Sequence, residues 1–111
     1  MKRSGWYGVS EYGKHLAGYN ANMDVSFCIV NLNAKSHLNN CLISIPRSID
    51  GLSYEIIITD NNSKDGSVEY IREQYSSARV ITNSRNEGYT KAINQALRCS
   101  KGEYKVILNP D

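Results

Sequence analysis

The stretch YEIIITDNNSKDGS, residues 54–67, decides the fold that the sequence predicts. It begins as a short apolar run rich in β-branched side chains, which is typical of a strand buried on both faces. It ends in turn and capping residues, of which Asp65-Gly66 is the strongest turn dipeptide. This combination, a buried strand followed at once by a polar loop, recurs along the chain.

Three further segments predict buried strands because they are short, apolar and rich in β-forming residues: VSFCIVNL at 25–32, ARVITN at 78–83 and YKVILN at 104–109. Between the strands, apolar residues recur at three- and four-residue spacing, which is typical of the buried stripe of a helix. The spacing predicts helices over residues 38–49, 67–75 and 89–100. Pro46 is expected to end or bend the first helix, and Ser67 to be the N-cap of the second.

The alternation of strands and helices predicts an α/β, Rossmann-like fold. Short connections between parallel strands require right-handed crossovers. We therefore expect a mostly parallel sheet of about four strands with helices on both faces. Residues 1–24 show neither a helical nor an alternating period, so we expect an irregular N-terminal extension before a domain that spans residues 25–111.

Composition narrows the class of protein. A chain of 111 residues fits one small domain, and 41% apolar residues permit a core. The formal net charge of +2 is too small to indicate a nucleic-acid binder, and no apolar run is long enough for a transmembrane helix. The three cysteines lack the spacing of a zinc site or a disulfide framework, which favours a reducing, cytoplasmic setting. No P-loop or dinucleotide-binding glycine motif is present.

Polar side chains follow every predicted strand. They are Asn31 and Asn33, then Asp60 to Asn62, then residues 83–88, and finally Asn109 with Asp111. Sheets of this kind bind ligands outside the carboxyl ends of the strands, near a reversal of strand order. Ordinary turn chemistry explains any one loop equally well, but loops that all converge on one crevice favour a ligand site.

Two carboxylates stand out among these residues. Asp60 directly follows a buried strand, where it can accept an N–H from a base or a hydroxyl proton from a ribose. Asp111 follows the last strand at the same edge of the sheet. A single carboxylate beside a diphosphate is a common way to hold Mg²⁺ or Mn²⁺, so Asp111 is the candidate metal ligand.

Four ordered motifs resemble the start of the family 2 glycosyltransferases, which have the GT-A fold and use nucleotide-diphospho-sugars. They are VSFCIVNLN, EIIITDNNSKDGSVEYI, NEGYTKAINQAL and KGEYKVILNPD, and they cover about residues 25–111. The order D-N-x-S-x-D-G-S, N-x-G-[FY] and L-N-P-D is most similar to the rhamnosyltransferase-like branch. Asn109-Pro110-Asp111 resembles the metal motif of the family.

The resemblance implies a set of site residues. Asp60 would contact the base, and the end of the first strand would form another wall of the base pocket. Gly88 and the helix after it would approach the ribose or diphosphate, and Asp111 would bind Mg²⁺ or Mn²⁺. The full set of implied nucleotide-sugar-binding residues is Val30, Asn31, Leu32, Asn33, Asp60, Asn62, Gly88, Lys91 and Asn109.

The resemblance also implies a function: an inverting transfer of a sugar from a UDP- or dTDP-linked donor to a glycan hydroxyl. The intact enzyme could be cytoplasmic or could bind peripherally at the inner face of the membrane, and the sequence leaves both open. The acceptor site and the general base belong to a second half of the fold that residues 1–111 do not supply. We therefore expect a fold that is incomplete at its C-terminus, we assign no catalytic residue, and we expect the fragment to be inactive alone.

Two other classes of function remain open from the residues. A non-catalytic α/β interaction module is the first, and it would self-associate through exposed sheet edges. A phosphoacceptor, receiver-like domain shares the alternating layout, but it needs a carboxylate cluster after the first strand. That strand here ends in Asn31 and Asn33, which disfavours this class.

Overall fold

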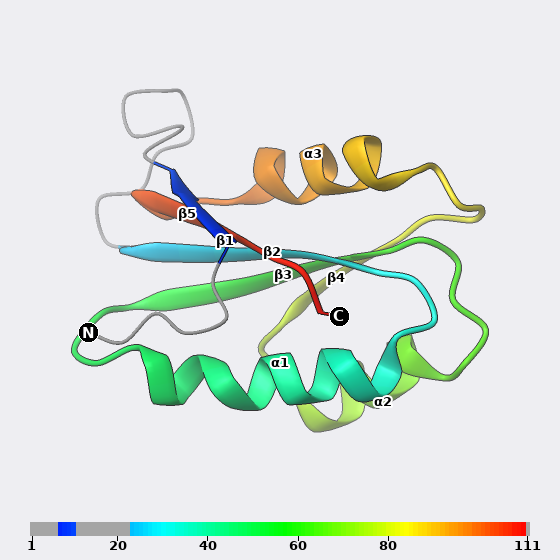
Figure 1. Ribbon diagram of the computed structural model, residues 1–111, viewed down its shortest axis with the longest axis horizontal. Coiled ribbons are helices and arrows are strands. Elements are labelled where there is room, and N and C mark those ends of the chain that lie inside the picture. The colour runs from blue at the N-terminus through cyan, green and yellow to red at the C-terminus, as the bar shows by residue number, and fades with distance from the viewer. Residues whose placement is uncertain (1–6, 11–22, 111) are drawn as a thin grey trace.

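The computed structural model describes residues 7–10 and 23–110 as one five-stranded sheet with helices on both faces (Figure 1). The strands are β1 (Tyr7–Ser10), β2 (Val25–Asn31), β3 (Tyr54–Asp60), β4 (Arg79–Thr82) and β5 (Tyr104–Leu108). The helices are α1 (Lys35–Ser48), α2 (Ser67–Gln74) and α3 (Tyr89–Cys99). The α/β, Rossmann-like fold predicted from the sequence is therefore confirmed. None of the helices in this described part of the chain is long and apolar enough to cross a bilayer.

The strand order β1-β5-β2-β3-β4 contains one reversal. The chain runs from β2 outward through β3 to β4, and then returns to place β5 on the other side of β2. The strands β5, β2, β3 and β4 are parallel, and Val25 is in register with both Tyr54 and Tyr104. The carboxyl ends of these strands therefore lie along one rim, and the reversal between β2 and β5 marks the expected ligand crevice on it.

The N-terminal extension was expected to be irregular, but part of it is a strand. Tyr7–Ser10 pairs antiparallel with β5, with an irregularity in register between Tyr7 and Val9. The four residues of β1 are too few to show an alternating pattern of apolar and polar side chains. The strand is defined instead by its pairing with the backbone of β5, which the sequence pattern does not report. The rest of the predicted extension up to residue 22 lies outside the described residues.

The two faces of the sheet bury different side chains. The face toward α1 and α2 carries the larger core, which includes Phe27, Ile29 and Leu108. The face toward α3 carries a smaller core that includes Cys28 and Ala96; of the three described helices, Figure 1 shows α3 on this side of the sheet and α1 and α2 on the other. Burial raises the pKa of the Cys28 thiol to about 12, so it remains protonated as a core side chain.

Helices α2 and α3 begin where the sequence predicts, but the start of α1 and the N-cap of α2 differ from the prediction. Helix α1 begins at Lys35, ahead of its apolar stripe, and α2 has Gly66 as its N-cap rather than Ser67. Asp65 explains both starts. Its carboxylate accepts the Lys35 amide at 3.0 Å and the Ser67 amide at 3.1 Å, and it also accepts the Ser67 hydroxyl. One side chain thus caps two helices. Pro46 lies inside the last part of α1, which continues to Ser48.

We expect Asp65→Ala to lower the free energy of unfolding at pH 7 by roughly 2 kcal/mol, because each helix cap contributes about 1 kcal/mol. Desolvation tends to raise the pKa of Asp65, but hydrogen bonds from Ser67 and Lys35 together lower it. A lowered folded-state pKa gives stability that is present above the unfolded value of about 3.9 and is lost as the pH falls through the folded value. Urea unfolding at several pH values should therefore show the wild-type advantage shrinking below about pH 4.

The matched control is Asp50→Ala, which removes an exposed carboxylate from the turn before β3. Its stability should stay near that of the wild-type chain at each pH. A cost for Asp65→Ala that stays constant down to acid pH would contradict the role of the charge in capping.

Candidate functional site

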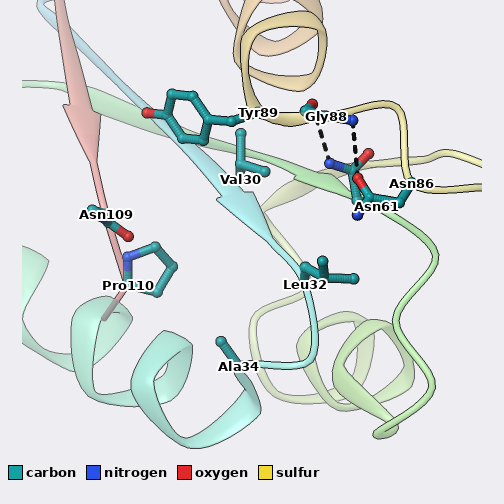
Figure 2. A pocket seen from close by; sticks show the side chains of 9 residues that line it. All are labelled: Val30, Leu32, Ala34, Asn61, Asn86, Gly88, Tyr89, Asn109 and Pro110. Carbon is teal, nitrogen blue, oxygen red and sulfur yellow. Dashed lines mark hydrogen bonds between the residues drawn. The ribbon is translucent and has the colours of Figure 1, made fainter.

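A pocket of about 350 Å³ lies at the reversal of strand order. It opens at the carboxyl ends of β2 and β5 and at the start of α3 (Figure 2). Its lining residues come from four loops that are far apart in the sequence: Val30, Leu32, Ala34, Asn61, Asn86, Gly88, Tyr89, Asn109 and Pro110. The crevice expected from the strand order is therefore an actual hollow in the protein.

Large apolar side chains line part of the rim. Tyr89 is 51% exposed and Leu32 is 43% exposed, and they are two of the four exposed large hydrophobic residues in the described part of the chain. Figure 2 shows them on opposite sides of Val30. Desolvation, with a smaller contribution from Cys28, raises the pKa of the Tyr89 phenol, so the ring is neutral at physiological pH. A flat ring or the apolar face of a sugar can pack against such surfaces.

The start of α3 gives the pocket a polar, electropositive side. Gly88 is the N-cap, with φ 87° and ψ 162°, and no side chain caps the helix. The first amides of a helix have no partner within the helix, and the helix dipole adds partial positive charge at this end. An anionic group is therefore favoured here, as at many helix N-termini that bind phosphate.

Asn61 connects this helix start to the sheet. Its Oδ1 accepts the Glu87 amide at 3.2 Å, and its Nδ2 donates to the Gly88 carbonyl at 3.3 Å, as Figure 2 shows for the second bond. Oδ1 also accepts a bond from Asn83 at 3.0 Å. An asparagine amide has two N–H groups, and only one is used in these bonds. Asn61, which lines the pocket, therefore keeps one N–H that these bonds do not use.

Asp60 lies next to Asn61 but does not line the pocket. It is 2% exposed, and its carboxylate accepts bonds from Asn31 Nδ2 at 2.8 Å, Ser63 Oγ at 2.7 Å and the Ser63 amide at 2.8 Å. The oxygen Oδ1 of the 1% exposed Asn31 has no partner among the described residues. These contacts join the loop after β2 to the loop after β3, beneath the rim.

Asn33 and Asn62 form hydrogen bonds in the same two loops, those after β2 and β3. The Asn33 amide donates to Ser63 Oγ at 2.9 Å, and its side chain accepts the Lys64 amide at 2.7 Å. Asn62 accepts a bond from Lys64 Nζ at 3.3 Å. Both asparagines have positive φ, 49° and 67° respectively, a conformation that Asn adopts more readily than most residues. Their contacts in the structure are those of turn residues.

Lys91 is occupied by an ion pair on the surface. Its Nζ lies 3.2 Å from Glu87 Oε1, and Arg85 binds the other oxygen of the same carboxylate at 3.0 Å. These hydrogen bonds, first from Arg85 and then from Lys91, lower the pKa of Glu87. Lys91 is thus close to the helix start without lining the pocket.

The structure brings together only part of the predicted set. Val30, Leu32, Gly88 and Asn109 line the pocket, whereas the other predicted nucleotide-sugar residues lie beneath or beside it. Asp111 lies outside the described residues. Within residues 7–10 and 23–110, no three His, Cys, Asp or Glu side chains form a metal-binding group. Asn109 lines the pocket, and its side chain carries an amide oxygen, the ligand type that Mg²⁺ and Mn²⁺ prefer.

Sequence reasoning missed some pocket residues: Ala34, Asn61, Asn86, Tyr89 and Pro110. The signal that could have identified Asn61 and Asn86 is their position in the polar loops that follow two of the predicted strands. The three- and four-residue spacing of apolar side chains in the predicted helix 89–100 places Tyr89 on its buried stripe. It is the first residue of α3, where the helix overhangs the rim of the sheet.

Comparison with known sequences identifies the class of protein to which this pocket belongs. The model of the family described as "Glycosyl transferase family 2" matches residues 26–111. The dolichol-phosphate mannosyltransferase of Pyrococcus furiosus is 28% identical over 91 residues, which is 80% of this chain and 26% of that protein. The chain therefore spans about a quarter of the length of this relative.

Solved structures share the architecture. Residues 1–349 of S. aureus TarS, solved in complex with UDP, superpose with a TM-score of 0.71 at 20% identity, over 80% of this chain and 28% of that chain. The glucosyl-3-phosphoglycerate synthase of Mycobacterium tuberculosis, solved with Mn²⁺, UDP and glucosyl-3-phosphoglycerate, superposes with a TM-score of 0.64 at 25% identity. That match covers the whole of this chain and 40% of the synthase. At 20% identity, the similarity to TarS supports the fold alone.

Proposed function

The chain belongs to glycosyl transferase family 2, and from this premise we propose that its pocket binds the nucleoside diphosphate of a sugar donor. The observation behind the proposal is the placement of the pocket, which joins an apolar rim to a helix N-terminus at the reversal between β2 and β5. A nucleoside diphosphate has the matching parts, a flat base and an anionic tail. The synthase that superposes on the whole chain was solved with UDP and Mn²⁺.

We place the diphosphate at the start of α3 and the base against the apolar rim. The uncapped amides after Gly88 would bind phosphate oxygens, and Tyr89 or Leu32 would pack on the base or the ribose. For the polar contact to the base or ribose we propose Asn61, because it lines the pocket and retains one N–H. Asp60 supports this wall from beneath.

Asp111 would hold Mg²⁺ or Mn²⁺ beside the diphosphate, with Asn109 close by at the pocket. A divalent cation bound there would stabilise the charge that develops on the departing nucleoside diphosphate. The residues of this chain would bind and orient the donor. Because the chain spans 26% of its Pyrococcus relative, we propose that the acceptor site and the general base for an inverting transfer lie outside these 111 residues. We propose further that the donor is UDP- or dTDP-linked and that the acceptor is a glycan. The rhamnosyltransferase-like branch of the family is also part of the proposal.

Calorimetric titration with UDP, with and without Mn²⁺, tests the proposal on wild-type chain, Tyr89→Ala and Asp111→Asn. We expect wild-type binding that strengthens with Mn²⁺. Tyr89→Ala should weaken binding roughly ten-fold in both conditions, since stacking on a base contributes about 1–3 kcal/mol. Asp111→Asn should remove mainly the increase that Mn²⁺ gives.

Thermal unfolding of each variant serves as the control, because neither substitution removes a buried contact described above. The proposal would be wrong if a folded wild-type chain bound none of UDP, dTDP and GDP. An equal loss for Asp111→Asn with and without Mn²⁺ would remove Asp111 from the metal site only.

A further inference from the structure

Amide side chains from three elements form a hydrogen-bonded chain behind the pocket. Asn83 Nδ2 donates to Gln95 Oε1 at 2.8 Å, and Gln95 Nε2 donates back to Asn83 Oδ1 at 2.9 Å. Asn83 Nδ2 also donates to Asn61 Oδ1 at 3.0 Å. Asn83 follows β4, Gln95 lies in the middle of α3, and Asn61 follows β3. Of these side chains only Asn61 lines the pocket.

The amide chain ends on the backbone of the pocket wall. Asn61 binds the Glu87 amide and the Gly88 carbonyl at 3.2 and 3.3 Å. The same carbonyl accepts the Ala92 amide at 3.2 Å, which begins the hydrogen bonding of α3. The positions of Gly88 and of the first turn of α3 therefore depend on where Asn61 is held, and Asn83 holds it.

The loop that precedes Gly88 has its other contacts at the surface: the Gly88 amide donates to Asn86 Oδ1 at 2.9 Å, and Arg85 and Lys91 pair with Glu87. Ser84, Arg85 and Asn86 are exposed, and Gly88 has a positive φ with no atom near the place of a Cβ. Glycine populates this region freely, so its conformation is set by its partners rather than by its own sterics. Exposed loops with few buried contacts open at low free-energy cost. Bonds from a buried amide are thus well placed to determine the geometry of this loop.

We infer that Asn83 and Gln95 are positioning residues for donor binding, which act through Asn61 on the backbone of residues 87–88. Neither side chain lines the pocket, and neither belongs to the set of residues predicted from the sequence. Their mutual pair ties the end of β4 to α3, so that the helix start keeps a fixed distance from the sheet rim. The inference rests on the proposed function, because it assigns these residues to the affinity for a nucleoside diphosphate.

The test compares Gln95→Met, Asn83→Ala and the double variant with wild-type chain. Methionine matches the length and helix propensity of glutamine but cannot form the reciprocal pair. We expect amide hydrogen exchange to accelerate at Glu87 and Gly88, and binding of UDP with Mn²⁺ to weaken roughly ten-fold, in both single variants. The double variant should bind about as weakly as the worse single variant, because both changes break one network.

Asn94→Met is the matched control, since Asn94 is the exposed neighbour of Gln95 on the same helix. It should leave both exchange and binding unchanged. Exchange at Leu97 and Cys99 separates a local effect from global destabilisation, which would accelerate every amide. Asn83→Ala keeps the test available if Gln95→Met does not fold.

Two negative outcomes differ in meaning. If wild-type chain binds UDP and both single variants bind it equally well with unchanged loop exchange, the inference is overturned while the proposed function stands. If folded wild-type chain has no affinity for UDP, dTDP or GDP, the proposed function fails and the role in donor binding fails with it.

Discussion

Replacing Gly102 with alanine is expected to lower the free energy of unfolding by about 3 kcal/mol, the upper part of the usual range for overpacking a tight interior. A Cβ at this position would lie 2.6 Å from the Ser26 amide nitrogen and 2.7 Å from both Ser26 Oγ and the Val25 carbonyl carbon. Two of these atoms are backbone of β2, the central strand of the parallel sheet. Urea denaturation followed by circular dichroism measures the loss.

The contacts around Gly102 explain why the chain passes so close to β2. The Gly102 amide donates to Ser26 Oγ at 2.8 Å, and that hydroxyl donates to Glu55 Oε2 at 2.6 Å. The buried Lys105 donates from Nζ to the Gly102 carbonyl at 3.1 Å. A larger residue would separate donors and acceptors that are buried together, which adds to the steric cost.

Lys101→Ala provides the comparison for Gly102→Ala, because Lys101 is the exposed residue just before it and its backbone bond to Glu55 is unaffected. It should change stability by less than about 0.5 kcal/mol. If Gly102→Ala were equally mild, β2 and the turn before β5 could not be packed as closely as the structure shows.

The parallel sheet and the layers of this fold could be predicted largely from the sequence. The apolar runs at Val25, Tyr54 and Tyr104 each became a buried strand, because a strand covered on both faces must be apolar throughout. The start of α1 and the N-cap of α2 could not be predicted in the same way. They depend on Asp65, which reaches the Lys35 amide from a distant loop, and no local pattern at residue 35 reports that contact.

The loops of the candidate site were predicted, but only four of the individually predicted residues, Val30, Leu32, Gly88 and Asn109, line the pocket. Asp60 and Asn61 are adjacent at the end of β3, and successive side chains on a strand point to opposite faces. The register that pairs Asn31 with Asp60 places both on the face of α1 and α2, whereas Asn61 turns toward α3 and the pocket. A one-residue difference decides which side chain meets a ligand, and the sequence alone does not fix it.

Replacing Asp60 with alanine is expected to destabilise the fold by about 3 kcal/mol, because it would leave buried donors without an acceptor. The carboxylate is 2% exposed, and it accepts bonds from Asn31 Nδ2, Ser63 Oγ and the Ser63 amide at 2.7–2.8 Å. Each unsatisfied buried group costs roughly 1–3 kcal/mol, and partial rearrangement or water reduces the sum. Equilibrium unfolding in urea, with UDP titration on the folded fraction, measures both consequences.

Lys64→Ala is the control for Asp60→Ala, since it shortens an exposed side chain in the same loop and leaves the backbone bond from Lys64 to Asn33 in place. It should unfold at nearly the wild-type urea concentration. The decisive comparison is between stability and affinity. One outcome would contradict this role: an Asp60→Ala variant as stable as wild-type chain that has lost its affinity for UDP. The carboxylate would then have to face the ligand, and its bonds to Asn31 and Ser63 could not be those of the donor-bound state. If stability falls while the folded fraction still binds UDP, Asp60 acts by joining the two loops that support the pocket.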